Sequence, residues 1–260
     1  MSSDSAALDL HYSSQGEGPP LLILHGLYGS AANWGRHAAW LAERHRVLLP
    51  DLRNHGRSPH APRMDYPAMA ADLLRLLDRE AIEQAAVLGH SMGGKVAMAL
   101  ALGHPQRVKS LVVADIAPVS YDSHGHRRLI EALQALPLAQ LSSRQAADAA
   151  LAAAIPNAMV RRFLLTNLQR GPAGYGWRIP LAILAEQLPV IETFPRIDGS
   201  YAGPALFLHG ADSDYVRPEH EPKIHRLFPQ ARIEALPDAG HWLHVEQPEA
   251  FAARLRRFLT

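Results

Sequence analysis

Short apolar runs alternate with segments of helical periodicity along most of this chain. A short apolar run bounded by turn residues is typical of a strand buried on both faces, whereas apolar residues three or four apart are typical of a helix. We predict strands at Leu21–Leu24, Val47–Leu49, Ala85–Leu88, Val108–Ala114, Ala205–Leu208 and Ala231–Leu236, after a first strand or hairpin near Leu8–Tyr12. Helices are predicted near Asn33–Arg44, Pro67–Glu80, Met92–Leu102, Pro218–Leu227 and Pro248–Leu259. This alternation predicts an α/β fold with a mostly parallel sheet and helices on both faces.

The alternation stops between Val119 and Gly203, where we find no strand-like run. Helical segments are predicted there instead, at Gly125–Leu136, Ser142–Ala154, Ala158–Leu168 and Pro180–Gln187. A segment of about eighty residues is too long for a simple loop. We expect residues 1–118 and 204–260 to form one core, and residues 119–203 to form a helical lid inserted after the sixth strand. An independent helical domain is the alternative, but the strand and helix pattern resumes after Gly203 and completes the core.

Composition and charge narrow the class of protein. Lys and Arg number 26 against 25 Asp and Glu, so no net field attracts nucleic acid or an anionic membrane. The 260 residues include no cysteine, which excludes disulfides, a thiol nucleophile and thiolate metal ligands. The N-terminal residues lack a signal-peptide pattern and no apolar run approaches the length of a membrane span. We therefore expect a soluble, cytoplasmic protein with no nucleic-acid or membrane partner; the pattern specifies no oligomeric state.

A candidate nucleophile lies between a predicted strand and a predicted helix. Ser91 occupies the centre of Gly89-His90-Ser91-Met92-Gly93, which has the form G-x-S-x-G. In a strand–turn–helix setting this pattern forms a sharp turn that exposes the serine, and the glycines allow the two backbones to approach closely. The context, more than the five residues alone, predicts a nucleophilic serine.

A serine hydroxyl needs a base, and the base needs a carboxylate that holds its tautomer. We predict His241 as the base, because it follows the last predicted strand and precedes the last helix. The chain contains 15 histidines, and for His90 and His209 a packing role at the strand ends is favoured. A metal site formed by Asp238, His241 and His244 can be considered, but the spacing matches no metal motif. We predict no metal and no cofactor.

Five segments of the sequence resemble the α/β-hydrolases, and more narrowly the bacterial YbfF-type esterases. The resemblance spans residues 21 to 248 and is looser in the predicted lid. Its segments are Leu24–Ser30, Asp51–Pro59, Gly89–Lys95, Asp115–Pro118 and Ala239–Pro248. It implies an α/β-hydrolase fold and a catalytic order of serine, acid and histidine along the chain.

The position of the acid departs from the usual α/β-hydrolase pattern. That pattern places the acid three residues before a valine in the loop after the next-to-last strand, and here the position is Ser213, three before Val216. The resemblance to YbfF-type esterases implies that Asp115, at the end of the preceding strand, is the acid. A carboxylate after such an apolar run must be paired or hydrogen-bonded. Asp212 and Asp214 remain the alternatives.

Oxyanion donors and a substrate pocket complete the prediction. We expect the backbone N–H groups of Leu27 and Met92 to stabilise an oxyanion, since Met92 follows the nucleophile and Leu27 follows the His25-Gly26 turn. The lid is expected to supply an apolar acyl pocket, and the entrance is expected near the oxyanion turn. The substrate-binding candidates are Tyr28, Trp34, Phe163, Leu164, Leu168, Trp177 and Leu181; core packing is the competing interpretation for each.

These features predict a serine carboxylesterase that cleaves esters of short to medium acyl chain through a Ser-His-Asp triad and an acyl-enzyme. An acyl-CoA thioesterase or other thioesterase is the first alternative. A perhydrolase or a carbon–carbon hydrolase uses the same triad. A ligand-binding or receptor-like protein with the same fold and little turnover is an alternative from a different class.

Overall fold

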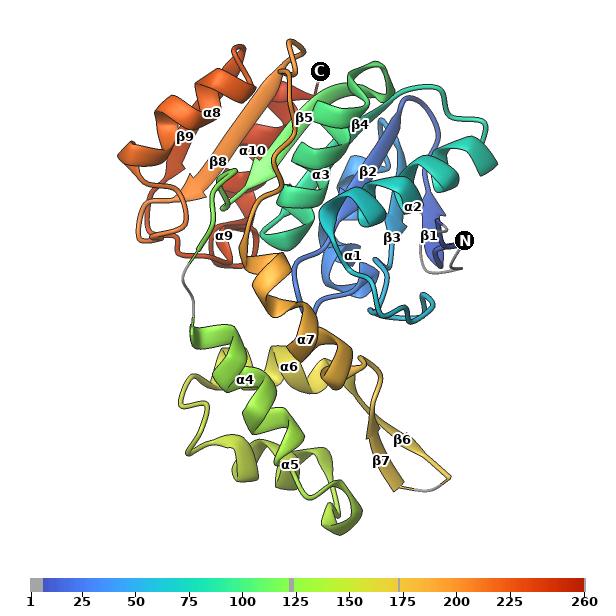
Figure 1. Cartoon of the computed structure of the whole chain (residues 1–260), viewed down its shortest axis with the longest axis vertical. Coiled ribbons are helices and arrows are strands. Elements are labelled where there is room, and N and C mark those ends of the chain that lie inside the picture. Colours follow the sequence, from blue (N-terminus) through green and yellow to red (C-terminus); the bar gives the residue numbers. More distant parts are fainter. Residues whose placement is uncertain (1–6, 122–123, 173, 260) are drawn as a thin grey trace.

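The computed structural model describes residues 7–121, 124–172 and 174–259. Its main sheet has seven strands in the order β1-β3-β2-β4-β5-β8-β9 (Figure 1). All neighbouring strands in this sheet are parallel except β1 and β3. The strands are β1 (Tyr12–Gln15), β2 (Pro20–Leu24), β3 (Arg46–Pro50), β4 (Ala85–His90), β5 (Val108–Ala114), β8 (Ala205–Gly210) and β9 (Ala231–Leu236).

Helices cover both faces of this sheet because its central strands are apolar on both sides. Leu22 and Leu24 of β2 face one apolar core, while Leu21 and Ile23 face the other. Helices α2 (Tyr66–Arg79), α3 (Met92–Gly103) and α8 (Glu221–Leu227) contribute to the first core. Helices α1 (Gly35–Leu41), α9 (Leu243–Glu246) and α10 (Pro248–Phe258) contribute to the second. The predicted α/β class, with a mostly parallel sheet and helices on both faces, is confirmed.

The N-terminal edge of the sheet differs from the prediction. In the described residues it is a single strand, Tyr12–Gln15, and no hairpin lies at Leu8–Tyr12. The backbone N–H of Leu8 donates to the side chain of Asp72, and that of His11 donates to the side chain of Ser58. These residues before β1 are thus bonded to side chains and not to a second strand of a hairpin. The expectation of six strands before the inserted segment is therefore wrong, because β5 is the fifth strand along the described chain.

The segment between β5 and β8 contains a hairpin that the sequence pattern did not predict. Strands β6 (Leu168–Gly171) and β7 (Gly174–Trp177) pair antiparallel around a turn with Gly174 at φ 106°. Only Leu168 of their eight residues is buried, so the pair has no buried apolar run, and the expectation of helices alone is wrong. The helices of the segment are α4 (His124–Gln134), α5 (Arg144–Leu151), α6 (Ala158–Leu164) and α7 (Leu181–Glu192).

Figure 1 shows these helices together beyond the ends of the strands at which β4 leads into α3. Short 3₁₀ turns complete the fold at Ala31–Trp34, Pro105–Arg107, Leu138–Gln140, Leu165–Asn167 and Pro218–His220.

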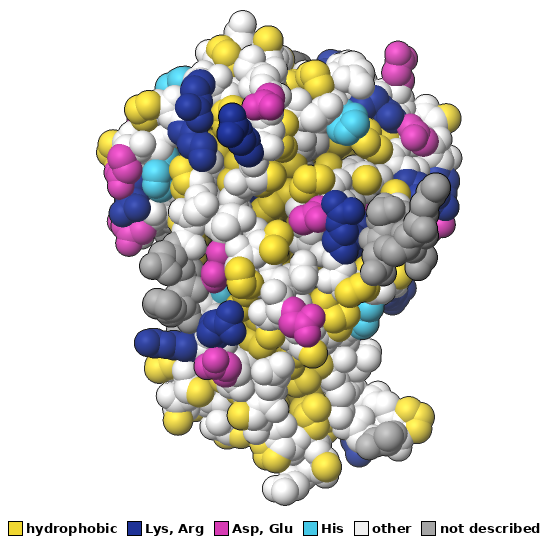
Figure 2. All heavy atoms as spheres, viewed as in Figure 1, with side chains coloured by type: hydrophobic (Ala, Val, Ile, Leu, Met, Phe, Trp, Pro, Cys, Tyr) yellow, Lys and Arg dark blue, Asp and Glu magenta, His cyan; other side chains and the backbone are white. Residues whose placement is uncertain are grey.

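On the face seen in Figure 2, basic and acidic side chains are interspersed. None of the helices in the described parts of the chain is long and apolar enough to cross a membrane.

Candidate active site

Ser91 lies at the sharp turn between β4 and α3. Its backbone has φ 54° and ψ −122°, a strained conformation for a residue with a side chain. A Cβ on Gly93 would lie 2.5 Å from the carbonyl oxygens of Leu24 and His25, and a Cβ on Gly89 would collide with the backbone of Gly93. Both flanking glycines are therefore required by the close approach of strand and helix.

Ser91, His241 and Asp115 form a continuous hydrogen-bonded chain. The Oγ of Ser91 lies 3.1 Å from Nε2 of His241. The Nδ1 of His241 lies 2.7 Å from Oδ2 of Asp115. Because an ionised carboxylate only accepts, Nδ1 carries the proton and Nε2 faces the serine hydroxyl as an acceptor. The structure thus brings together the three residues that the sequence analysis selected.

Asp115 is fully buried, and its carboxylate accepts two further hydrogen bonds. The backbone N–H of Gly210 donates to Oδ1 at 3.0 Å, and the hydroxyl of Ser213 donates to Oδ2. Asp212 and Asp214 are exposed on the same loop. Ser213 was not among the predicted site residues, although it occupies the position of the usual acid; that replacement was the signal that could have identified it.

His241 is held between aromatic rings. The ring of Tyr215 stacks on it with centroids 4.1 Å apart, and the ring of His90 lies 4.7 Å away. Nε2 of His90 donates to the carbonyl oxygen of His241 at 2.8 Å. Burial lowers the pKa of His90 to about 3, so its ring remains neutral near pH 7. His90 therefore fixes the backbone that carries His241, which agrees with the supporting role predicted for it.

The turn that carries Leu27 is fixed by two buried imidazoles. Nδ1 of His25 donates to the carbonyl of Gly26 at 2.8 Å, while Nε2 of His55 accepts the N–H of Tyr28 at 3.1 Å. Burial lowers the pKa of both rings, that of His55 to about 3, so both are neutral. A Cβ on Gly26 would lie 3.3 Å from Cβ of Ser91, which shows how closely this turn approaches the serine.

The loop behind this turn is anchored by a buried ion pair. Arg53 donates to both carboxylate oxygens of Asp72 at 2.7 Å, and its other N–H groups donate to backbone carbonyls. The backbone carbonyl of Arg53 accepts from Nδ1 of His55. Through the loop from Asp51 to Ser58, Arg53 and His55 thus support the turn that carries Leu27, although neither lines the cavity.

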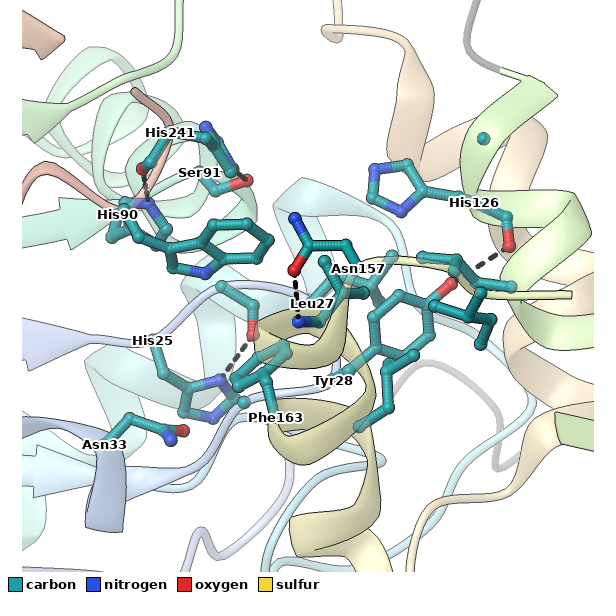
Figure 3. A pocket seen from close by; sticks show the side chains of 18 of the residues that line it. His25, Leu27, Tyr28, Asn33, His90, Ser91, His126, Asn157, Phe163 and His241 are labelled. Atoms are coloured by element: carbon teal, nitrogen blue, oxygen red, sulfur yellow. Dashed lines mark hydrogen bonds between the residues drawn. The ribbon is translucent and has the colours of Figure 1, made fainter. Parts of the chain in front are cut away.

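A cavity of about 460 Å³ opens above Ser91 and His241. Figure 3 shows His241 and Ser91 beside each other, with His126 across the cavity and Asn157 between. Four predicted substrate-binding residues line it: Tyr28, Trp34, Phe163 and Leu164. Leu168, Trp177 and Leu181 do not line it, which corrects their predicted placement. Leu168 and Leu181 are buried in the core, and the indole N–H of Trp177 donates to the carbonyl of Leu133.

Several lining residues were missed from the sequence. Asn157 caps α6 by accepting the N–H groups of Met159 and Val160, and no apolar pattern identifies it as a lining residue. His126 lines the cavity from α4, and burial lowers its pKa to about 4. Further lining residues that were not predicted are His25, Gly26, Gly29, Asn33, His90, Gly125, Arg128, Leu129, Ala154, Ile155, Pro156, Val160, Tyr215, Trp242 and His244. Helical periodicity predicted the helical segments, but it did not show which face of each helix lines the cavity.

No cluster of three or more His, Cys, Asp or Glu side chains in the described ranges is arranged to hold a metal ion. Within those ranges Asp238, His241 and His244 form no such group, because His241 is bonded to Asp115 and His244 is buried against the ring of Trp34.

The chain is similar to known proteins over most of its length. The family model described as "alpha/beta hydrolase fold" matches residues 19–248. The mouse protein named sn-1-specific diacylglycerol lipase ABHD11 is 42% identical, covering 93% of this chain and 81% of its own. Esterase YbfF of Escherichia coli is 38% identical, covering 95% of both chains. A solved structure titled "Marine microorganism esterase" has a TM-score of 0.94 and 40% identity, covering 97% of this chain and 100% of its own.

The family model covers the main sheet from β2 to β9, the serine turn and the histidine loop together. The chain belongs to the α/β-hydrolase fold family and resembles the YbfF esterase.

Proposed function

We propose that this protein, a carboxylic ester hydrolase, works through Ser91 as nucleophile, His241 as base and Asp115 as the acid that orients His241. The observation that supports this most strongly is the unbroken chain Ser91 Oγ, His241 Nε2, His241 Nδ1 and Asp115 Oδ2, with spacings of 3.1 and 2.7 Å. Relatives named esterase and lipase support the ester-hydrolysing activity.

The reaction proceeds in two steps. Ser91 Oγ attacks the ester carbonyl while His241 Nε2 takes the hydroxyl proton, and the oxyanion accepts from the N–H groups of Leu27 and Met92. His241 then returns the proton to the leaving alkoxide, which departs as alcohol and leaves the acyl group on Ser91. Water, deprotonated by His241, attacks this acyl-enzyme, and the carboxylic acid and free Ser91 are released.

Residues 119–203 act in this proposal as a lid over the core formed by residues 1–118 and 204–260. Support comes from the cavity lining, which includes His126 of α4 and Val160 and Phe163 of α6 beside Ser91 of the core. A cavity of about 460 Å³ suits a small-molecule ester of short to medium acyl chain.

The test is a fluorophosphonate probe combined with p-nitrophenyl esters. Wild-type protein is expected to be labelled and to hydrolyse the esters, and Ser91→Ala is expected to lose both properties. An unlabelled, inactive wild type would favour the receptor-like alternative. Acyl-CoA substrates assayed beside the esters separate the thioesterase alternative from an oxygen esterase.

A further inference from the structure

Ser91 lies where two cavities of very different size meet. The large cavity measures about 460 Å³, whereas a second one beside Ser91 measures about 30 Å³. Ser91, Leu27, His126 and Tyr215 line both of them. An ester bound at Ser91 therefore has one roomy side and one confined side.

Of the proposed catalytic groups, His241 lines the large cavity and not the small one, Met92 lines the small one and not the large one, and Ser91 and Leu27 line both. The proton that His241 takes from Ser91 must be delivered to the leaving oxygen, so that oxygen lies on the His241 side of the tetrahedral carbon. The acyl carbon chain occupies the remaining direction, away from His241. The small cavity, which Met92 lines and His241 does not, is the space that fits this direction.

We infer that the small cavity is the acyl subsite and the large cavity the alcohol subsite. The preferred substrate class is then an ester of a very short acyl group, acetyl or propionyl, with a bulky, largely apolar alcohol. This inference rests on the proposed function and reverses the sequence-based expectation that the lid supplies the acyl pocket.

The walls of the small cavity are packed core residues. Met92, Ile116 and Ile191 are at most 5% exposed, and Tyr66 is 1% exposed. The phenol O–H of Tyr66 donates to the backbone carbonyl of Ile191, which ties α2 to the end of α7. A longer acyl chain must displace these side chains, and overfilling a packed core is unfavourable.

Glu192 and His126 also line the small cavity, but two of its polar side chains, those of Lys95 and Tyr121, already donate to backbone carbonyls. The ammonium of Lys95 donates to the carbonyls of Glu192 and Thr193 at 3.0 and 2.7 Å and lies over the ring of Tyr121 at 4.8 Å. The phenol of Tyr121 donates to the carbonyl of Tyr215. What these residues present to an acyl group is mainly aliphatic and ring surface, which suits a methyl or ethyl group.

The large cavity differs in being wide and in being bordered by the inserted segment. Side chains from two helices of the inserted segment surround it, including Leu129 of α4 and Val160, Phe163 and Leu164 of α6. Apolar surface on the alcohol lowers the free energy of binding there by burial. An alcohol with a larger apolar group is therefore expected to bind more tightly.

Two substrate series with the wild-type enzyme test the assignment. With p-nitrophenol fixed as leaving group, kcat/KM is expected to be highest for acetyl or propionyl and to fall about tenfold or more by hexanoyl, the scale of an overpacking penalty. With acetyl fixed, acetates of methanol, butanol, hexanol and phenylethanol are expected to show KM falling with alcohol size.

Three variants localise the effect. Ile191→Ala enlarges the small cavity and is expected to raise the hexanoyl-to-acetyl ratio of kcat/KM about fivefold or more; Ile191→Val serves if the alanine variant folds poorly. Leu188→Ala, a buried change on the same helix that lines neither cavity, is the matched control and should leave that ratio unchanged. Val160→Ala should change the acetate series but not the acyl series.

A wild type that prefers hexanoyl or octanoyl, or an acyl ratio that responds to Val160→Ala and not to Ile191→Ala, would overturn the assignment of the two subsites. Ser91-dependent hydrolysis would persist in that case, so the proposed function would stand. Loss of ester hydrolysis altogether, with no fluorophosphonate labelling, would instead refute the proposed function.

Discussion

Oδ2 of Asp115 lies 2.7 Å from Nδ1 of His241, so the carboxylate comes from the end of β5 and not from the loop after β8. That loop contributes Ser213, whose hydroxyl donates to the same carboxylate oxygen. The hydroxyl of Ser213 thus occupies the position of the acid in the usual α/β-hydrolase pattern, and the carboxylate that contacts His241 comes from β5. The two positions converge because β5 and β8 are neighbouring parallel strands.

Asp115→Asn is expected to lower kcat by about 10³–10⁴-fold with little change in KM. The asparagine oxygen can still accept from Gly210, but its amide would donate to Nδ1 of His241 and hold the wrong tautomer. Steady-state kinetics and a thermal unfolding curve check this result. The exposed Asp212→Asn and Asp214→Asn variants are the controls; a large loss in either, with Asp115→Asn active, would move the acid to that loop.

Ser213→Ala is expected to lower kcat about tenfold, far less than the loss of Asp115. The hydroxyl supplies one hydrogen bond to a buried carboxylate that keeps its bonds to Gly210 and His241. Ser213→Thr retains a hydroxyl and should restore most of the activity. If Ser213→Ala had wild-type kcat, the hydroxyl would have no part in orienting the triad.

The same glycine-to-alanine substitution is expected to have opposite effects at two positions. At Gly93 a Cβ would lie 2.5 Å from two backbone carbonyls, so Gly93→Ala should lower the free energy of unfolding by about 3 kcal/mol or more and reduce activity. At Gly35, φ is −53° and nothing lies within 4 Å of the added carbon. Gly35→Ala should therefore raise the free energy of unfolding by about 0.5–1 kcal/mol. Urea denaturation of both variants decides the comparison.

Acid destabilisation is expected from imidazoles that are buried in the neutral form. Burial lowers the pKa of His55 from 6.5 to about 3. Between these values the unfolded chain binds a proton that the folded chain does not, so the free energy of unfolding falls as the pH falls. The stabilisation is fully present above pH 6.5 and is lost as the pH decreases toward 3. His90, whose pKa is also lowered to about 3, adds to the same trend.

His55→Asn removes one of these groups and is expected to reduce the pH slope of the free energy of unfolding by about 1.4 kcal/mol per pH unit between about pH 6 and pH 4. Urea denaturation at a series of pH values measures this slope. His225→Asn is the control, because His225 is exposed and its solvation changes little on folding. An unchanged slope in His55→Asn would mean that the imidazole is protonated in the folded protein.

The sequence determined the elements that have a local signature. Apolar runs identified the inner strands of the main sheet, because a strand buried on both faces is largely apolar. The predicted strand at Ala231–Leu236 is an edge strand, in which only Leu236 is buried. Ser91 and its glycines were predictable, because only glycine fits where strand and helix backbones approach so closely. The hairpin of β6 and β7 had no such signature, since only Leu168 of its eight strand residues is buried.

Only the tertiary structure shows which residues from distant segments of the chain lie together in the site. It brings Asp115 next to His241 across 126 positions of sequence, and the residues themselves left Asp212 and Asp214 open as alternatives. It also separates Phe163 and Leu164, which line the cavity, from Leu168 and Leu181, which pack in the core. Periodicity identifies apolar residues because burial follows from solvation, but which buried surface faces a cavity depends on how the helices pack against each other.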